Sequence, residues 1–268
     1  QSAVSHSLDK LRVIFDDALF IRAGRGITPS ARAETIADDV RRLLSQLQDV
    51  TSSPAFIPQE ADIQYTVAAN DLQREFLLPD FYKRVSQQVR KFSLRIIPAD
   101  LPNVDLLRRG ECDFLIAPVA PDAQDIMQRR LVNDEMCCIY DGTVREPPKT
   151  LEEYREARHI SLTFMEHLDR EISKRYFGEI NQLNIAVRVS NFSGIAGFLR
   201  GTDMITTLPR LMAQALMPEF SQADLPFNSK KLSFYLLWHK RHQADPTHHW
   251  LRTKFDDVVK EKLATTND

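Results

Sequence analysis

Hydrophobic residues recur at helical spacing near the start of the chain. The apolar positions, three or four residues apart, are Val4, Leu8, Leu11 and Phe15. The opposite face is polar and partly basic: Ser5, His6, Ser7, Lys10 and Arg12. This pattern predicts an amphipathic helix. A short strand, a Gly24-Arg25-Gly26 tip and a return that ends at Pro29 follow. Residues 1–32 are therefore predicted to form a helix with a two-stranded wing.

A second helix is predicted over residues 33–50. Its apolar positions alternate in steps of three and four residues, as in the a and d positions of a coiled coil: Ala33, Ile36, Val40, Leu43 and Leu47. This stripe is too short to form a coiled coil alone, so it must pair with a second copy or pack on a neighbour. We expect it to be a dimerisation helix, with contacts made by Ile36, Val40, Leu43 and Leu47. The alternative is a helix packed against its own wing.

The pattern changes after a linker at residues 51–61, which contains two prolines. Strands and helices then alternate. Predicted strands lie at residues 63–70, 92–99, 112–119, 135–141, 159–164, 185–190, 203–209 and 231–239. Predicted helices lie at residues 72–89, 103–110, 151–157, 168–177, 193–199, 210–216 and 246–264. Such alternation predicts an α/β fold with mainly parallel strands.

The overall composition is that of an ordinary globular protein, with 43% hydrophobic residues. The net charge of −2 does not indicate a nucleic-acid partner, so any DNA contact must come from local charge. Five basic residues stand against three acidic ones up to Arg32, which is a weak local excess. No run of ~18 apolar residues occurs, so no membrane partner is predicted.

Cysteine and histidine patterns do not predict a catalytic or metal site. The three cysteines, Cys112, Cys137 and Cys138, lack metal-ligand spacing. Small buried residues of a reduced, cytoplasmic protein are the favoured interpretation, with a redox switch as the alternative. Three histidines cluster before the last helix: His242, His248 and His249. A solvated helix start is favoured there over a metal site. His159, Ser161 and Asp169 lack a nucleophile elbow. We therefore predict no enzyme, no metal and no cofactor.

The first helix has side chains suited to the major groove of DNA. Small hydroxyl and imidazole groups can bond base edges or phosphates, and wing arginines can reach the backbone or the minor groove. The predicted DNA-binding residues are Gln1, Ser2, Ser5, His6, Ser7, Lys10, Arg22 and Arg25. Composition alone favours the alternative, an amphipathic surface helix followed by a hairpin.

The order of residues in "QSAVSHSLDKLRVIFDDALFIRAGRGITPSARA" resembles the recognition helix, wing and linker-helix start of LysR-type transcriptional regulators. The shared pattern is Q-x-A-V-S, L-x-x-L-R, L-F-x-R, G-R-G and T-P-x-A. The ending "LLWHKRHQADPTHHWLRTKF" resembles the subgroup that answers aromatic acids and flavonoids. The family places two helices before the recognition helix. The sequence starts after them, so we expect it to be a fragment whose head is partial.

The resemblance implies a partial winged helix-turn-helix at residues 1–32, a linker helix at 33–50 and a hinge linker at 51–61. It further implies an effector domain that resembles periplasmic binding proteins. Subdomain I would comprise residues 62–133 and 237–268, and subdomain II residues 134–236. The implied partners are double-stranded DNA, a small-molecule effector, further copies of the chain and RNA polymerase. The alternative is a bilobal solute-binding protein of the same fold, which would need a secretory signal.

The effector is expected where strands end, because ligands of open α/β sheets bind beyond the carboxyl ends of strands. The predicted effector-binding residues are Asn70, Asp71, Pro98, Asp100, Pro118, Thr163, Phe164, Asn191, Phe192, Ser193 and Thr207. Free N–H groups near Ser193 and Asp71 are expected to take a carboxylate. For each residue taken alone, an ordinary cap or turn is the favoured interpretation. Asn191 and Phe192 gain weight because the resembling motif has a polar residue and an aromatic one there.

Overall fold

The computed structural model describes residues 2–23, 26–51, 56–99, 103–119, 121–163 and 183–266. It divides the chain into two units, Gln1–Ala55 and Phe56–Asp268. We call the first unit the head and the second the effector body. Gln1, Arg25, Asp100, Phe164 and the predicted helix at residues 168–177 lie outside the described residues.

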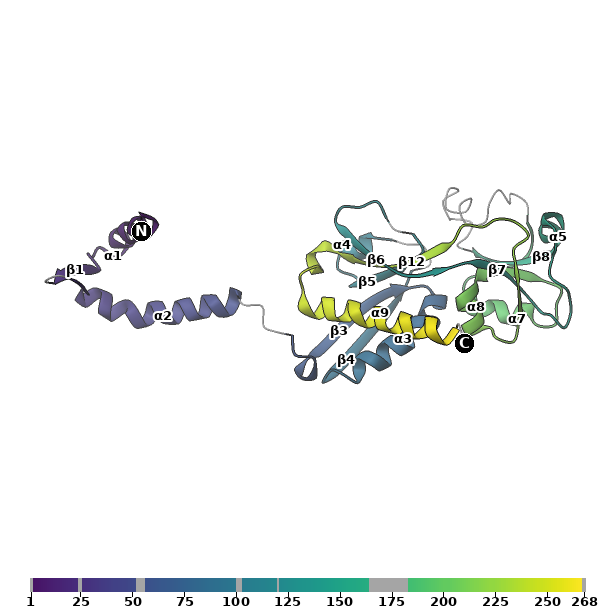
Figure 1. The fold of residues 1–268 in the computed structure, drawn as a ribbon, viewed down its shortest axis with the longest axis horizontal. Helices are drawn as coiled ribbons and strands as arrows, with labels where there is room; N and C mark the ends of the chain where they lie inside the picture. The colour runs from purple at the N-terminus through teal and green to yellow at the C-terminus, as the bar shows by residue number, and fades with distance from the viewer. Residues whose placement is uncertain are drawn as a thin grey trace. The chain divides into compact units, whose positions relative to one another are not determined.

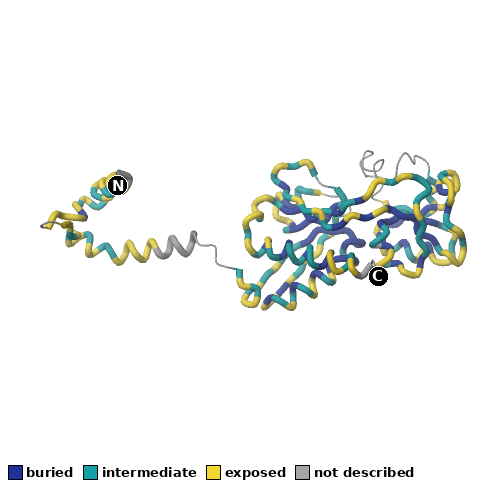
Figure 2. The backbone as a smooth tube through the Cα atoms, in the orientation of Figure 1, coloured by how far each residue is buried: buried dark blue, intermediate teal, exposed yellow. Residues whose placement is uncertain are grey.

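The head contains the elements that its pattern predicted. Helix α1 spans Ser2–Phe15, and helix α2 spans Ala31–Thr51. Between them, β1 (Phe20–Ala23) and β2 (Gly26–Pro29) form an antiparallel ladder in which Phe20 pairs with Pro29. Figure 2 shows that most described residues of α1 and α2 are exposed within this unit.

One hydrogen-bond cluster joins the wing to the start of α2. Asp17 accepts hydrogen bonds from the Leu19 amide at 2.6 Å and from the Ser30 hydroxyl. Ser30 Oγ in turn accepts from the Ala33 amide at 3.1 Å, so Ser30 caps α2. The Ser30 hydroxyl and the Leu19 amide hold the pKa of Asp17 below its usual value. Ionised Asp17 therefore fixes where α2 leaves the wing.

The effector body is built on two five-stranded sheets (Figure 1). The first has the order β4-β3-β5-β12-β6, with strands at Lys91–Pro98, Asp62–Ala69, Phe114–Ala117, Leu232–His239 and Ile126–Asp134. The second has the order β11-β7-β10-β8-β9, with strands at Ser221–Asp224, Met136–Tyr140, Ile205–Pro209, Arg158–Leu162 and Asn184–Val189. We call the part around the first sheet subdomain I and the part around the second subdomain II.

The prediction of mainly parallel strands is confirmed for strand direction, because in each sheet one strand, β12 or β7, runs opposite to the other four. In the first sheet β3 is parallel to β4 and β5, but β12 is antiparallel to β5 and β6. In the second sheet β8 is parallel to β9 and β10, but β7 is antiparallel to β10 and β11. The antiparallel pairs arise because the chain passes from one sheet to the other and back.

The two passages fix the boundary between the subdomains. Strand β6 ends at Asp134 and β7 begins at Met136, so only Glu135 separates the sheets. The chain was predicted to leave subdomain I between residues 133 and 134, next to this point. The return of the chain to subdomain I was predicted at residue 237, which falls inside β12. Because β12 pairs with β6 from Leu232 onward, the return lies before Leu232.

Helices cover the sheets. Among the described residues of the body, these helices are α3 (Asp71–Ser86), α4 (Asp105–Arg108), α5 (Leu151–Glu156), α7 (Ile195–Leu199), α8 (Arg210–Leu216) and α9 (Pro246–Thr266). Short 3₁₀ turns lie at Pro58–Glu60, Phe192–Gly194 (η3) and Lys240–His242 (η4). Pro79 lies inside a continuous α3. Gly110 follows α4 with a φ of 71°, a left-handed conformation that favours glycine.

Aromatic packing holds the C-terminal helix against subdomain I. The Phe81 ring of α3 stacks on the Phe255 ring of α9 with centroids 3.8 Å apart. Phe56, the first residue of the effector body, packs on Trp250 of α9 with centroids 5.4 Å apart. The linker therefore enters the body against its last helix.

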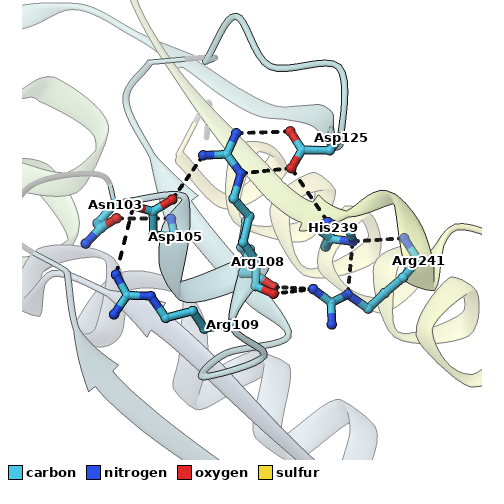
Figure 3. A network of polar contacts seen from close by, with 8 residues as sticks. Asn103, Asp105, Arg108, Arg109, Asp125, His239 and Arg241 are labelled. Atoms are coloured by element: carbon cyan, nitrogen blue, oxygen red, sulfur yellow. Dashed lines mark hydrogen bonds and ion pairs between the residues drawn. The ribbon is translucent and has the colours of Figure 1, made fainter.

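A polar network ties α4 to the end of β12 (Figure 3). Arg108 donates two hydrogen bonds to Asp125, at 2.8 and 3.1 Å, and this bidentate contact lowers the pKa of Asp125 to about 2. His239 Nδ1 accepts from the Arg241 amide at 3.1 Å. Arg241 also donates to the carbonyl of Arg108. The network secures the loop before β6, and we assign it a structural role.

Helix α9 itself contributes a buried arginine and a buried histidine. Arg252 is 1% exposed, and its Nη1 donates to His248 Nδ1 at 2.7 Å. His248 is fully buried, and its Nε2 donates to the Asp113 carbonyl at 3.4 Å. The His248 ring must therefore be neutral, because its Nδ1 is an acceptor. Burial lowers the pKa of His248 to about 4.

The free energy of unfolding of the effector body is expected to fall as the pH drops from 6.5 to about 4. In this window the unfolded chain binds a proton at His248 that the folded chain does not bind. The loss reaches about 3 kcal/mol. Urea unfolding at several pH values would measure it. His248→Gln keeps an acceptor for Arg252 without titrating, so its pH dependence should be shallower. Equal slopes for the two proteins would contradict this account.

Candidate functional site

The start of α3 is a polar turn at the carboxyl end of β3. Asn70 Oδ1 accepts from the Gln73 amide at 2.9 Å, and Gln73 Oε1 accepts from the Asn70 amide at 3.2 Å. This reciprocal pair is a capping box, which satisfies two donors of the helix start. Asn70, Asp71 and Gln73 are all buried. Gln73 Nε2 has no hydrogen-bond partner in the part of the chain that the structure describes.

A second polar turn follows β9 in subdomain II. Asn191 Oδ1 accepts from the Gly194 amide at 3.0 Å and from the Ser193 hydroxyl at 3.1 Å. A Cβ on Gly194 would lie 3.3 Å from Asn191 Oδ1, so this close turn favours glycine. Asn191 and Ser193 are exposed, whereas Phe192 is 8% exposed and belongs to the main hydrophobic cluster.

The two turns meet across the subdomain boundary. The Ser193 amide donates to Asp71 Oδ2 at 2.9 Å, so a carboxylate of subdomain I binds a turn of subdomain II. The expectation of a free N–H at Ser193 was therefore wrong, because the protein supplies its own carboxylate there. Four predicted residues, Asn70, Asp71, Asn191 and Ser193, are thereby brought together.

Of the other predicted effector residues in the described part of the chain, Pro98, Pro118 and Thr163 lie at strand ends, whereas Thr207 lies in the middle of β10. Pro98 pairs with Ala69, one residue before Asn70. Thr163 follows β8, and its hydroxyl donates to the Val189 carbonyl at 3.1 Å, close to the Asn191 turn. Pro118 follows β5. The Thr207 hydroxyl hydrogen-bonds the Tyr154 hydroxyl and is half-buried.

Sequence reasoning missed a second carboxylate at the boundary. Asp134, the last residue of β6, is 4% exposed. Both of its oxygens accept from the Leu211 amide at 3.1 Å, at the start of α8. Anionic groups are stabilised at helix starts. An acidic residue between two predicted strands was the available signal, but nothing in the sequence paired it with α8.

The predicted DNA-binding residues of the head lie on α1 and the wing. Ser5, His6, Ser7 and Lys10 are exposed on α1, and Arg22 is exposed on β1. Ser2 is the first residue of α1. The dimerisation stripe of α2 is also uncovered within the head: Val40 is 38% and Leu43 59% exposed, and Ile36 is intermediate. The side chain of Leu47 lies outside the described residues.

The cysteines are poor nucleophiles in this fold. Cys112, Cys137 and Cys138 are free and buried, and burial raises the pKa of each thiol to about 12. Among the described residues, no three His, Cys, Asp or Glu side chains are grouped so that they could hold a metal ion. None of the described helices combines the length and apolar character needed to cross a membrane.

Comparison with known proteins gives consistent matches. Residues 59–259 match the family model described as the LysR substrate binding domain. The chain is 30% identical to nodulation protein D 2 of Rhizobium tropici, over 94% of this chain and 82% of that protein. It is 25% identical to the HTH-type transcriptional activator NagR of a Ralstonia species, over 97% of this chain and 89% of that protein. The structure of a probable transcriptional regulator from Pseudomonas aeruginosa aligns with a TM-score of 0.65 and 25% identity. The alignment covers 96% of this chain and 87% of that one.

Proposed function

Because the chain belongs to the LysR-type family of transcriptional regulators, we propose that its effector is a small aromatic acid bound at the subdomain boundary. Members of this family bind DNA, respond to a small-molecule effector and form oligomers. The protein is therefore a regulator of transcription and not an enzyme. The alternative of a solute-binding protein is rejected, because the matches extend over nearly the whole chain and include a transcriptional activator.

The observation that carries the proposal is the polar surface shared by both subdomains. Asn191 and Ser193 supply an amide and a hydroxyl group that are exposed to solvent. Gln73 Nε2 is a buried donor without an acceptor among the described residues. An unpaired buried donor costs about 1–3 kcal/mol. A ligand carboxylate that reached this amide would remove that cost. Aromatic ligands fit such sites, because pockets combine apolar walls with a few placed polar groups.

The expected macromolecular partners are DNA, a second copy of the chain and RNA polymerase. We propose that Ser5, His6, Ser7, Lys10 and Arg22 contact DNA in the intact head, together with Gln1, Ser2 and Arg25. Two heads joined through α2 would match a two-fold DNA site. Regulation at a promoter implies a cytoplasmic location, and it gives RNA polymerase as a further partner.

Benzoate and salicylate are expected to raise the melting temperature of the intact protein, whereas neutral benzamide at the same concentration has little effect. Binding of a ligand to the folded state alone stabilises it by mass action. Gln73→Glu keeps the oxygen that accepts from the Asn70 amide, but it replaces the donor with a second acceptor. This variant should lose the response to acids by at least about tenfold in Kd.

Gln87→Glu is the matched control, because Gln87 lies at the other end of the same helix. It should respond as the wild type does. No thermal shift with any aromatic acid, or an unchanged shift in Gln73→Glu, would count against the proposed site.

A further inference from the structure

We propose that Asp71 is a latch that holds the two subdomains of the effector body together. The inference does not rest on the proposed function, because the latch joins two residues of the chain itself.

The first ground is the position of the hydrogen bond. Asp71 opens α3, which follows β3 of subdomain I. Ser193 lies in η3, which follows β9 of subdomain II. The Asp71–Ser193 bond of 2.9 Å therefore joins residues 122 positions apart and on different sheets. The atoms that it joins must separate if α3 moves away from η3.

The second ground is the contrast with Asp134. Its carboxylate also binds a backbone amide of the other subdomain, that of Leu211. However, Asp134 lies at the passage from β6 to β7, with one residue between the two strands. A contact at the covalent connection between two bodies persists when they rotate about it. Asp71 lies at the start of α3, outside both segments that connect the subdomains. Its hydrogen bond must therefore break when the subdomains separate, and it resists that separation.

The third ground is burial. Asp71 is 5% exposed, and its neighbour Leu72 belongs to a hydrophobic cluster that also contains Phe192 and Ile195 of subdomain II. A hydrogen bond to a charged group is stronger in such surroundings than in water. Loss of one charge-assisted bond should change the ratio of joined to separated states by about tenfold or more.

Spin labels measure the separation directly. One label is placed at Gln87→Cys, at the end of α3, and the other at Glu152→Cys in α5, both on exposed positions. The native thiols are buried, with their pKa values raised, so the introduced cysteines are the ones that react. The label-to-label distances are compared in the ligand-free, intact protein with and without Asp71→Ala.

Asp71→Ala should add a longer distance to the distribution and raise hydrogen exchange at the Ser193 amide by at least about tenfold. Asp71→Asn keeps an uncharged acceptor, so its effect should be intermediate, and it guards against misfolding of the alanine variant. Asp141→Ala is the matched control, because Asp141 binds the Gly201 amide at 2.7 Å within subdomain II. It should leave the distances between subdomains unchanged.

Distances in Asp71→Ala and Asp71→Asn that match the wild type would overturn the latch. Longer distances in Asp141→Ala as well would also overturn it, because the effect would then not be specific to the boundary. The benzoate shift of the wild type is recorded in parallel. Its absence would count against the proposed function, while the distance comparison, which needs no ligand, would still decide the latch.

Discussion

Leu43→Asp is expected to dissociate the oligomer of the intact protein. Leu43 is 59% exposed in the single chain and lies on the apolar stripe of α2 with Ile36 and Val40. We expect two copies to bury this stripe against each other. An aspartate there would leave a charge without a partner in an apolar interface, which costs about 3–5 kcal/mol. The dimer dissociation constant should therefore rise on the order of a thousandfold.

Thr35→Asp controls for the added charge. Thr35 lies on the outward side of the same helix, and its hydroxyl bonds the Ala31 carbonyl. Sedimentation velocity over a range of concentrations should show a monomer for Leu43→Asp and the wild-type assembly for Thr35→Asp. The alternative, a helix that packs only on its own wing, requires all three proteins to sediment alike.

Phe192→Ala is expected to destabilise the effector body by about 3–5 kcal/mol. The ring is 8% exposed and belongs to a hydrophobic cluster that also contains Ile195 and Leu199. Truncation leaves a cavity in this cluster and loosens the turn that presents Asn191 and Ser193. Urea unfolding measures the loss.

Phe192→Leu keeps most of the volume and should cost much less, in the range of volume-conserving changes below about 1.5 kcal/mol. Similar stability of the alanine and leucine variants would contradict the burial of this ring. A direct contact between Phe192 and the effector remains a prediction. It is better tested with Phe192→Leu, because that variant should stay folded at ordinary temperatures.

Local sequence patterns predicted most elements of the head and body. The helical spacing from Val4 to Phe15 gave α1, and the stripe from Ala33 to Leu47 gave α2. Arg210–Leu216 was predicted to the residue. Each of these segments has the apolar period of a helix, and this local pattern predicts the helix even where, as in α1 and α2, much of the apolar stripe is exposed within the head.

Two strands, β6 and β11, were not predicted, because they form by pairing with neighbouring strands and their own composition does not mark them as strands. β6 contains Arg129 and Arg130, and its outward residues are polar, so no apolar run marks it. It forms because β12 pairs with it along its length. β11 has the sequence SQAD and lies at the edge of its sheet, beside β7. Without these strands, the antiparallel half of each sheet could not be predicted.

The sequence predicted which residues lie in the candidate site, because they follow strand ends, but it did not predict the contacts between them. The rule that ligands bind beyond carboxyl ends selected Asn70, Asp71, Asn191 and Ser193. It could not foresee that Asp71 would bind the Ser193 amide, because these residues are 122 positions apart and belong to different sheets. Pairing of this kind depends on how two subdomains meet, which local sequence does not specify.

DNA binding by the intact protein tests the central claim most directly. Fluorescence anisotropy would compare the DNA upstream of its own gene with a scrambled duplex of equal length, over a salt series from ~50 to ~200 mM. A LysR-type regulator should prefer its own site by about a thousandfold or more. Its affinity should fall steeply, on a straight line of log affinity against log salt, as counterions are released. Equal affinity for both duplexes, or affinity that does not change with salt, would contradict the account.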